Sequence, residues 1–258
     1  MFKTNDIDLY KQFVKTIFKM RYKGSFLGFL WVLLKPFFMF LILFIVFSST
    51  SSSAIGLTSK EYAVYLLSGL VIYTFFNEGF VWGMNAIMER SSLIVKINFK
   101  REISVISALT MAVINLCINI LIIAVIALIL GINISPVAIA YIFLICLTMF
   151  ICLYGISLFT SILLVHVRDL SHIMELVLQL LFYASAVFYP VSMIPENFRF
   201  IVKFNPVAVF IQSVREALLY GNVVNLKFVL ITLGISIILS IIGKKFFNKN
   251  ISKIAEYF

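Results

Sequence analysis

Residues 103–130 read ISVISALTMAVINLCINILIIAVIALIL, and this run contains no charged side chain. A backbone that crosses hydrocarbon must satisfy its own hydrogen bonds, and about 20 apolar residues in a helix span the bilayer core. The run is therefore predicted to be a transmembrane helix. The composition agrees, because 62% of the 258 residues are hydrophobic and only 12% are charged, whereas soluble domains carry about 25% charged residues.

Five other stretches are long and apolar enough to cross a membrane. The sequence thus predicts an all-α integral membrane protein with six transmembrane helices in one domain, residues 26–245. The predicted spans are approximately residues 26–48, 62–86, 103–130, 136–165, 173–189 and 226–243. The small residues at 52–54 resemble a signal cleavage site, but the apolar run before them is longer than the roughly 7 to 15 residues of a signal core, so we expect no cleavage.

The basic residues predict the orientation. When the N-terminus is placed in the cytoplasm, fifteen Lys and Arg residues lie on the cytoplasmic side and five lie outside. Cytoplasmic loops of membrane proteins carry this excess of positive charge. We therefore expect a multi-pass protein of the cytoplasmic (inner) membrane with both termini in the cytoplasm, including a tail at residues 246–258. The same bias explains the net charge of +10 without nucleic acid, because the chain has no soluble domain to present a basic face.

Residues 6–24 are predicted to form an amphipathic helix within a cytoplasmic N-terminal segment, residues 1–25. The apolar residues recur with helical spacing and are Tyr10, Phe13, Val14, Ile17 and Phe18. The basic residues recur every four positions on the opposite face and are Lys11, Lys15, Lys19 and Lys23. Such a helix lies along an anionic membrane surface and contacts membrane lipids. The alternative is a helix that binds a soluble partner.

The cytoplasmic connection at residues 89–102 is apolar in its middle and basic at its edges. The apolar residues are Leu93, Ile94, Val95, Ile97 and Phe99, and the basic residues are Arg90, Lys96, Lys100 and Arg101. An exposed apolar patch with a charged rim is typical of a docking surface for another protein. The alternative is a segment that lies against the bilayer surface.

The longest connection, residues 190–225, lies outside in the predicted topology. It is too apolar for a loop in water, yet Pro195 and Pro206 interrupt it, so it cannot cross as one helix. Two short helices that dip part-way into the outer half of the membrane, with Asn205-Pro206 at the bend, fit this composition. The residues then expected near the membrane interface are Arg199, Lys203, Arg215 and Glu216.

Two charged residues lie well inside predicted spans, where a charge costs about 2.5 to 3.5 kcal/mol on insertion scales. Lys35 either faces an internal path or extends toward the cytoplasm. Glu78 is expected to face a subunit contact or a cavity rather than lipid.

No motif of an enzyme or of a self-powered transporter appears. The sequence contains no GxxxxGK[ST] phosphate loop, and no connection is large enough for an ATPase domain. It lacks the relay of intramembrane acidic and His residues that proton-coupled carriers use. GxSxG and HExxH are absent, and the three cysteines (Cys117, Cys146, Cys152) have no metal-ligand spacing. The chain is therefore predicted not to be an enzyme, to bind no metal or cofactor, and to take its energy from another protein.

Several short motifs follow one another along the chain. They are Tyr22-Lys23-Gly24-Ser25-Phe26-Leu27-Gly28-Phe29-Leu30-Trp31, Lys35-Pro36, Leu93-Ile94-Val95-Lys96-Ile97-Asn98-Phe99, Val167-Arg168-Asp169, Phe188-Tyr189-Pro190, and Asn205-Pro206 with Arg215 beyond. Each is weak alone, but their order and spacing together resemble the permease subunits of type-2 ABC exporters of O-antigen, capsule and teichoic-acid polysaccharides. The likeness covers nearly the whole chain. Lys100 and Ala186 stand where that family commonly has proline.

The resemblance implies a homodimer of permease subunits with two ATP-binding cassette subunits, which bind ATP and Mg²⁺ and grip a coupling helix at residues 89–102. It implies that lipid-linked polysaccharide passes between the first and fifth spans of both protomers. Candidate lining residues are Lys35, Phe37, Phe38, Phe40, Phe44, Phe182, Tyr183, Phe188 and Tyr189. Aromatic faces stack on sugar rings, although packing or lipid contact is the alternative for each of them.

The outer segment would then act as a gate. Its candidate residues are Pro190, Asn205, Pro206 and Arg215. Two other functions stay open at this point, an ABC permease for drugs, peptides or lipids and a membrane scaffold that transports nothing.

Overall fold

A computed structural model describes residues 4–22, 28–97, 99–131 and 134–252, and this part of the chain is helical without strands. The long helices are α2 (Trp31–Ile55), α3 (Ser59–Asn85), α5 (Glu102–Ile129), α6 (Pro136–His166) and α10 (Leu226–Asn250). The shorter ones are α1 (Thr4–Tyr22), α4 (Ser91–Lys96), α7 (Leu170–Ala184), α8 (Arg199–Phe204) and α9 (Pro206–Tyr220). A 3-10 turn, Gly28–Leu30, leads into α2.

Five helices are long and apolar enough to cross a membrane, and they are the five long helices with the 3-10 turn joined to α2. All five begin within three residues of the predicted positions. The helix of the last predicted span, α10, continues past residue 243 to Asn250 and carries Lys244, Lys245 and Lys249 in its final turns. The predicted boundary between membrane domain and tail at residues 245 and 246 therefore falls inside one continuous helix.

The fifth predicted span differs from the structure. Its helix, α7, has 15 residues and ends at Ala184, so it rises about 22 Å, less than the roughly 30 Å of a bilayer core. Residues 185–189 were predicted to be helical but leave the helix, and Ala186 adopts a left-handed backbone with φ of 51°. The structure thus supports five spans of full length. Helix α7 alone is too short to be a sixth.

Local sequence explains where the helices begin. Thr58 caps α3, because its hydroxyl accepts the Glu61 amide at 3.3 Å while the Glu61 carboxylate accepts the Thr58 amide at 2.8 Å. Ser135 caps α6 by accepting the Ala138 amide at 3.1 Å, and Pro136 occupies the first helical position.

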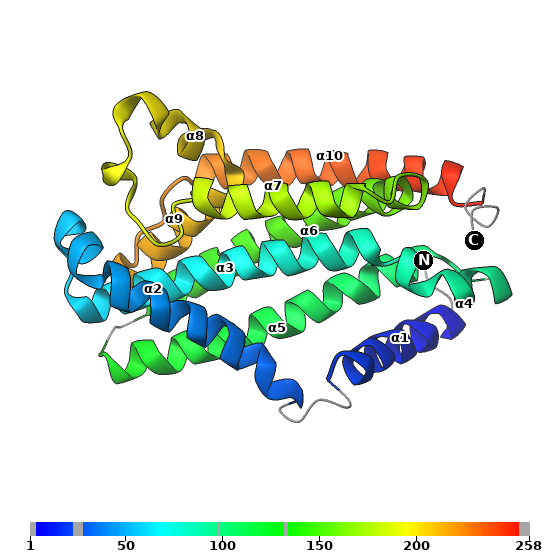
Figure 1. Cartoon of the computed structure of the whole chain (residues 1–258), viewed down its shortest axis with the longest axis horizontal. Coiled ribbons are helices and arrows are strands. Elements are labelled where there is room, and N and C mark those ends of the chain that lie inside the picture. The colour runs from blue at the N-terminus through cyan, green and yellow to red at the C-terminus, as the bar shows by residue number, and fades with distance from the viewer. Residues whose placement is uncertain (1–3, 23–27, 98, 132–133, 253–258) are drawn as a thin grey trace.

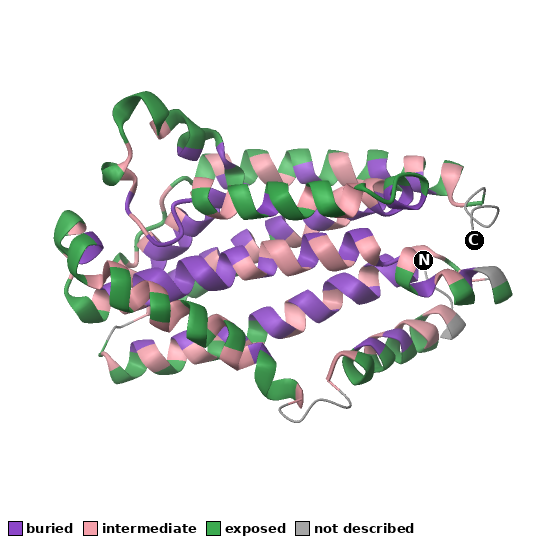
Figure 2. Cartoon of the chain, viewed as in Figure 1, coloured by how far each residue is buried: buried purple, intermediate pink, exposed green. Residues whose placement is uncertain are grey.

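Helix α3 forms the centre of the bundle. It contacts α2, α5, α6 and α9, and most of its length is buried (Figure 2). Helix α10 packs along α6 (Figure 1). Helices α2 and α10 are mostly exposed, with outward apolar residues such as Ile42, Ile45, Ile231 and Ile238. Such surfaces suit lipid or another membrane protein rather than water.

The two ends of the bundle carry different short helices. Helices α1 and α4 lie at the same end as both chain termini, and α8 and α9 lie toward the opposite end (Figure 1).

Candidate functional site

The connection between α3 and α5 consists of a 3-10 turn, Met88–Arg90, followed by α4. Ile94 is buried, whereas the side chains of Leu93 and Ile97 are 39% and 45% exposed and Lys96 is exposed as well. The backbone of Val95 belongs to α4, but its side chain and all of Asn98 lie outside the described residues. The free tip of the connection is therefore formed by Leu93, Lys96 and Ile97.

Three basic residues that were expected to rim this tip bind within the chain instead. Arg90 is buried and donates to the Ala86 carbonyl at 2.8 Å, which caps the end of α3, and its burial lowers the pKa of the guanidinium. Lys100 pairs with Asp6 of α1 at 2.7 Å, and Arg101 donates to the Ile251 carbonyl at the end of α10. Lys96 is exposed, and the Lys100 side chain is still 46% exposed beside its ion pair.

The amphipathic helix was predicted correctly as α1, but its apolar face contacts protein. Phe13 and Ile17 are buried, and the Tyr10 hydroxyl lies 2.9 Å from Thr110 Oγ1 of α5. The ring of Phe13 meets Phe99 edge-on at 5.4 Å. The exposed residues of α1 include Lys11, Lys15, Lys19, Ile7 and Phe18, and Lys23 lies outside the described residues. The exposed surface of α1 is therefore mixed, basic and apolar.

The last turn of α1 reaches a buried polar chain that sequence reasoning missed. The Tyr22 hydroxyl donates to Asn115 Oδ1 at 3.1 Å, and Asn115 Nδ2 donates to Glu78 Oε2 at 2.9 Å. Glu78 thus faces α5 within one protomer rather than lipid. The available signal was the pair Asn115 and Asn119, four residues apart in a run without charges, because buried amides need partners.

The aromatic candidates on α2 and α7 separate into two sets. Phe37, Phe38 and Tyr183 are about half exposed, and Lys35 is exposed beside the first two. Phe40, Phe44, Phe182 and Tyr189 are only partly exposed, and Phe188, expected to line a path, is buried against Phe47 with ring centroids 4.8 Å apart. The first set is exposed at the surface of the chain, and the second joins α2 and α7 to α3.

The predicted bend at Asn205-Pro206 is present between α8 and α9. Asn205 Oδ1 accepts the Val207 amide at 3.0 Å, and Asn205 Nδ2 donates to Ser185 Oγ at 2.9 Å. Pro206 is the first residue of α9, where its missing amide proton costs nothing. Asn205 therefore both caps α9 and ties it to the point where α7 ends. Pro190, the other candidate of this segment, is buried.

Arg215, which was expected near the membrane interface, is buried in the protein. Its side chain is 3% exposed and lies 3.6 Å from the centroid of the Tyr65 ring. The guanidinium donates to the carbonyls of Tyr65 at 3.0 Å, Ala186 at 2.9 Å and Val187. Arg215 thus joins α9 to α3 and to the non-helical end of α7.

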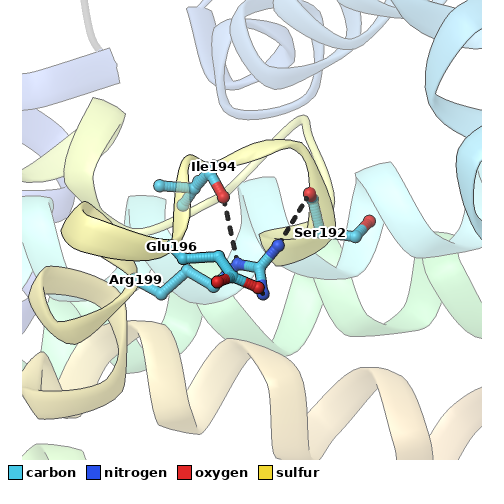
Figure 3. A network of polar contacts seen from close by, with 4 residues as sticks. All are labelled: Ser192, Ile194, Glu196 and Arg199. Carbon is cyan, nitrogen blue, oxygen red and sulfur yellow. Dashed lines mark hydrogen bonds and ion pairs between the residues drawn. The ribbon is translucent and has the colours of Figure 1, made fainter.

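Arg199 does remain at the surface of the outer segment (Figure 3). Its Nε donates to the Ile194 carbonyl at 3.0 Å, its Nη2 to the Ser192 carbonyl at 3.4 Å, and its Nη1 pairs with Glu196 at 3.3 Å. These bonds hold the turns before α8 in one compact loop. Lys203 is exposed on α8.

Comparison with known proteins finds similarity over most of the chain. The model of the family described as "ABC-2 type transporter" matches residues 8–219, from α1 to the end of α9. An O-antigen export system permease protein RfbA of Klebsiella pneumoniae is 29% identical over 238 residues, which is 92% of this chain and 90% of that protein. An O-antigen export system permease protein RfbA of Myxococcus xanthus is 31% identical over 182 residues, 69% of this chain and 67% of that protein.

Proposed function

This chain belongs to the ABC-2 type transporter family, and from that membership we infer that it is the permease subunit of an exporter that carries a lipid-linked polysaccharide across the cytoplasmic membrane. The observation that supports the cargo is the likeness to O-antigen export permeases over 92% of the chain. Because such permeases are transmembrane subunits rather than enzymes, ATP is hydrolysed in a separate subunit. In this proposal the chain itself binds no cofactor, and ATP and Mg²⁺ stay with that partner.

The ATP-binding partner docks on the tip of the connection between α3 and α5. Leu93 and Ile97 offer exposed apolar side chains there, and Lys96 adds a positive charge. A small apolar centre with a polar surround is the usual composition of a binding hot spot. The backbone under the tip is fixed by the buried Ile94 and by the bond from Arg90 to Ala86, so movement of the partner would reach α3 and α5.

The substitution Leu93→Asp tests this docking. Loss of a hot-spot side chain costs about 2 kcal/mol or more, so we expect the affinity for the ATP-binding partner to fall by more than about tenfold. Because Leu93 is exposed, the variant should insert and fold normally. Affinity is measured by co-purification at graded partner concentrations.

Ser92→Asp is the matched control, since Ser92 is exposed on the same helix and receives the same charge. It should bind nearly as well as the unaltered chain. Equal binding of Leu93→Asp and the unaltered chain would refute docking at this tip.

Two copies of the chain form the export path between them. The supporting feature is the exposed aromatic surface of α2 and α7, which includes Phe37, Phe38 and Tyr183 and which one protomer leaves uncovered. Aromatic faces stack on sugar rings. In the assembled dimer α7 and the outer segment act together as the sixth crossing, with α8 and α9 as gate helices in the outer membrane half. The N-terminal segment 1–25 lies at the inner surface and the end of α10 extends into the cytoplasm.

Cysteine labelling tests this topology. Single cysteines in place of Lys60 and Lys203 should react with an impermeant thiol reagent added to intact cells, and a cysteine in place of Lys249 should react only after lysis. All three lysines are exposed, so the side of the membrane on which each cysteine lies decides whether the reagent reaches it. The reverse pattern would overturn the proposed orientation. The natural cysteines are first replaced by Ala.

The cargo is tested by depletion of the chain in its host. Loss of a glycan exporter should make lipid-linked polysaccharide accumulate on the cytoplasmic side, because synthesis continues while export stops. Extraction and chromatography of the lipid-linked glycans measures this. A drug, peptide or lipid permease, or a scaffold without transport, would leave that pool unchanged.

A further inference from the structure

Four consecutive residues at the end of the cytoplasmic connection bind three different helices. The ring of Phe99 contacts Phe13 of α1, and Lys100 pairs with Asp6 of the same helix at 2.7 Å. Arg101 donates to the carbonyl of Ile251 at the C-terminal end of α10. Glu102 then opens α5 and binds both α10 and α6. The C-terminal end of the connection is therefore bound to α1, α6 and α10, which are distant from it in sequence.

Glu102 makes the contacts that bridge two long helices. Its Oε2 lies 2.9 Å from Lys244 Nζ of α10, and the Tyr154 hydroxyl of α6 donates to the same oxygen at 3.5 Å. The Glu102 side chain is 13% exposed and the Lys244 side chain 53%. A carboxylate in the first turn of a helix is also favoured by the helix dipole. One oxygen thus holds α5, α6 and α10 together.

The residues that bind Glu102 Oε2 lie next to a close contact between α6 and α10. Tyr154 and Lys244 directly adjoin Gly155 and Gly243, where α6 and α10 approach closely. A Cβ atom built on Gly243 would lie 2.8 Å from the Gly155 carbonyl oxygen, so the two backbones are in contact at this point. Glu102 therefore attaches the connection to α6 and α10 beside a place where their backbones are in contact.

We infer that Glu102 is a positioning residue that transmits displacement of the connection to α10 through Lys244 and Tyr154. The inference rests on the proposed function, because it requires an ATP-binding partner that moves the connection. Without the Glu102 contacts, the connection keeps the bond from Arg101 to the Ile251 carbonyl just past the end of α10, but it is no longer tied to Lys244 and Tyr154. With them, α5, α6 and α10 move together.

Charge reversal tests the inference in the assembled transporter with its ATP-binding partner. E102K and K244E each break the pair, and the double variant restores it with the charges exchanged. A bimane fluorophore on Ile241→Cys, an exposed site of α10, reports whether a non-hydrolysable ATP analogue moves this helix. The matched control is Lys245→Glu, which makes the same charge change at the neighbouring exposed residue.

We expect the nucleotide response of the fluorophore to fall at least about fivefold in each single variant, to return in the double variant, and to persist in Lys245→Glu. Partner binding should stay unchanged in all of them, which a general loss of folding would not allow. A response that persists in both single variants, or that is absent from the unaltered complex, overturns the inference.

A second measurement separates this inference from the proposed function. Glycan export by the same complexes is assayed in proteoliposomes. A complex that shows the expected fluorophore pattern but exports no glycan leaves the inference intact and refutes the cargo. A complex that exports glycan equally well with E102K and with the unaltered chain overturns the inference and leaves the cargo intact.

Discussion

Replacement of Arg215 by Ala is expected to lower the free energy of unfolding by about 2 to 4 kcal/mol, because buried carbonyls lose their donors. The carbonyls of Ala186 and Val187 lie in the non-helical turn after α7 and accept from this guanidinium. The Tyr65 carbonyl lies inside α3 and retains its helical bond, so its loss matters less. Unfolding by SDS in mixed micelles measures the difference.

Gly69→Ala disturbs the contact between Arg215 and the Val187 carbonyl from the α3 side. A Cβ atom at this position would lie 2.4 Å from Nη2 of Arg215 and 2.9 Å from the Val187 carbonyl oxygen. The guanidinium must then move while its charge stays buried, and overpacking of this kind costs about 1 to 3 kcal/mol. Because both substitutions remove one interaction, the double variant should lose less than the sum of the two.

Arg199→Ala is the matched control in the outer segment. Arg199 also donates to two backbone carbonyls, but it stands at the surface, where water replaces lost bonds (Figure 3). Its removal should cost no more than about 1 kcal/mol. Equal losses for Arg199→Ala and Arg215→Ala would show that burial of Arg215 contributes nothing to its effect.

The long spans were predictable from the sequence because their signals are local. Residues 103–130 and 136–165 were predicted, and α5 and α6 occupy residues 102–129 and 136–166. An uninterrupted apolar run fixes a helix in lipid, and the Ser135-Pro136 cap marks a start. No tertiary contact is needed to place such ends.

The end of α7 was not predictable, because its cause lies elsewhere in the chain. The apolar run continues through Phe188, yet the helix ends at Ala184. The carbonyls freed at Ala186 and Val187 are bound by Arg215, nearly thirty residues further on. Backbone carbonyls leave no signature in the sequence, so neither the early end of α7 nor the burial of Arg215 could be inferred.

Periodicity likewise identified the apolar face of α1 but not its neighbour. The spacing of Phe13 and Ile17 predicted a face that avoids water. A bilayer surface and the side of α5 satisfy that requirement equally, and the structure places α5 there. For the same reason, composition predicted the basic rim of the connection. The groups that Arg90, Lys100 and Arg101 bind could be identified only from the structure.

The second large effect is expected at the crossing of α6 and α10. A Cβ atom at Gly155 would lie 2.9 Å from the Ser240 amide nitrogen and 3.1 Å from the Leu239 carbonyl carbon. These are backbone atoms and cannot move aside without separating the helices. Membrane helices associate through such close contacts because lipid supplies no hydrophobic driving force between them. Gly155→Leu is therefore expected to lower the free energy of unfolding by about 3 kcal/mol or more.

Gly234→Leu provides the control on α10 itself. A Cβ atom there would meet no heavy atom within 4 Å, and Leu favours helix over Gly by up to about 1 kcal/mol. This variant should be as stable as the unaltered chain or slightly more so, and Gly155→Ala should fall between the two Leu variants. If all three unfold alike, close approach of the backbones at Gly155 does not hold α10 in place. If they separate in the expected order, the crossing is rigid enough to serve as the fixed point to which Glu102 attaches the cytoplasmic connection.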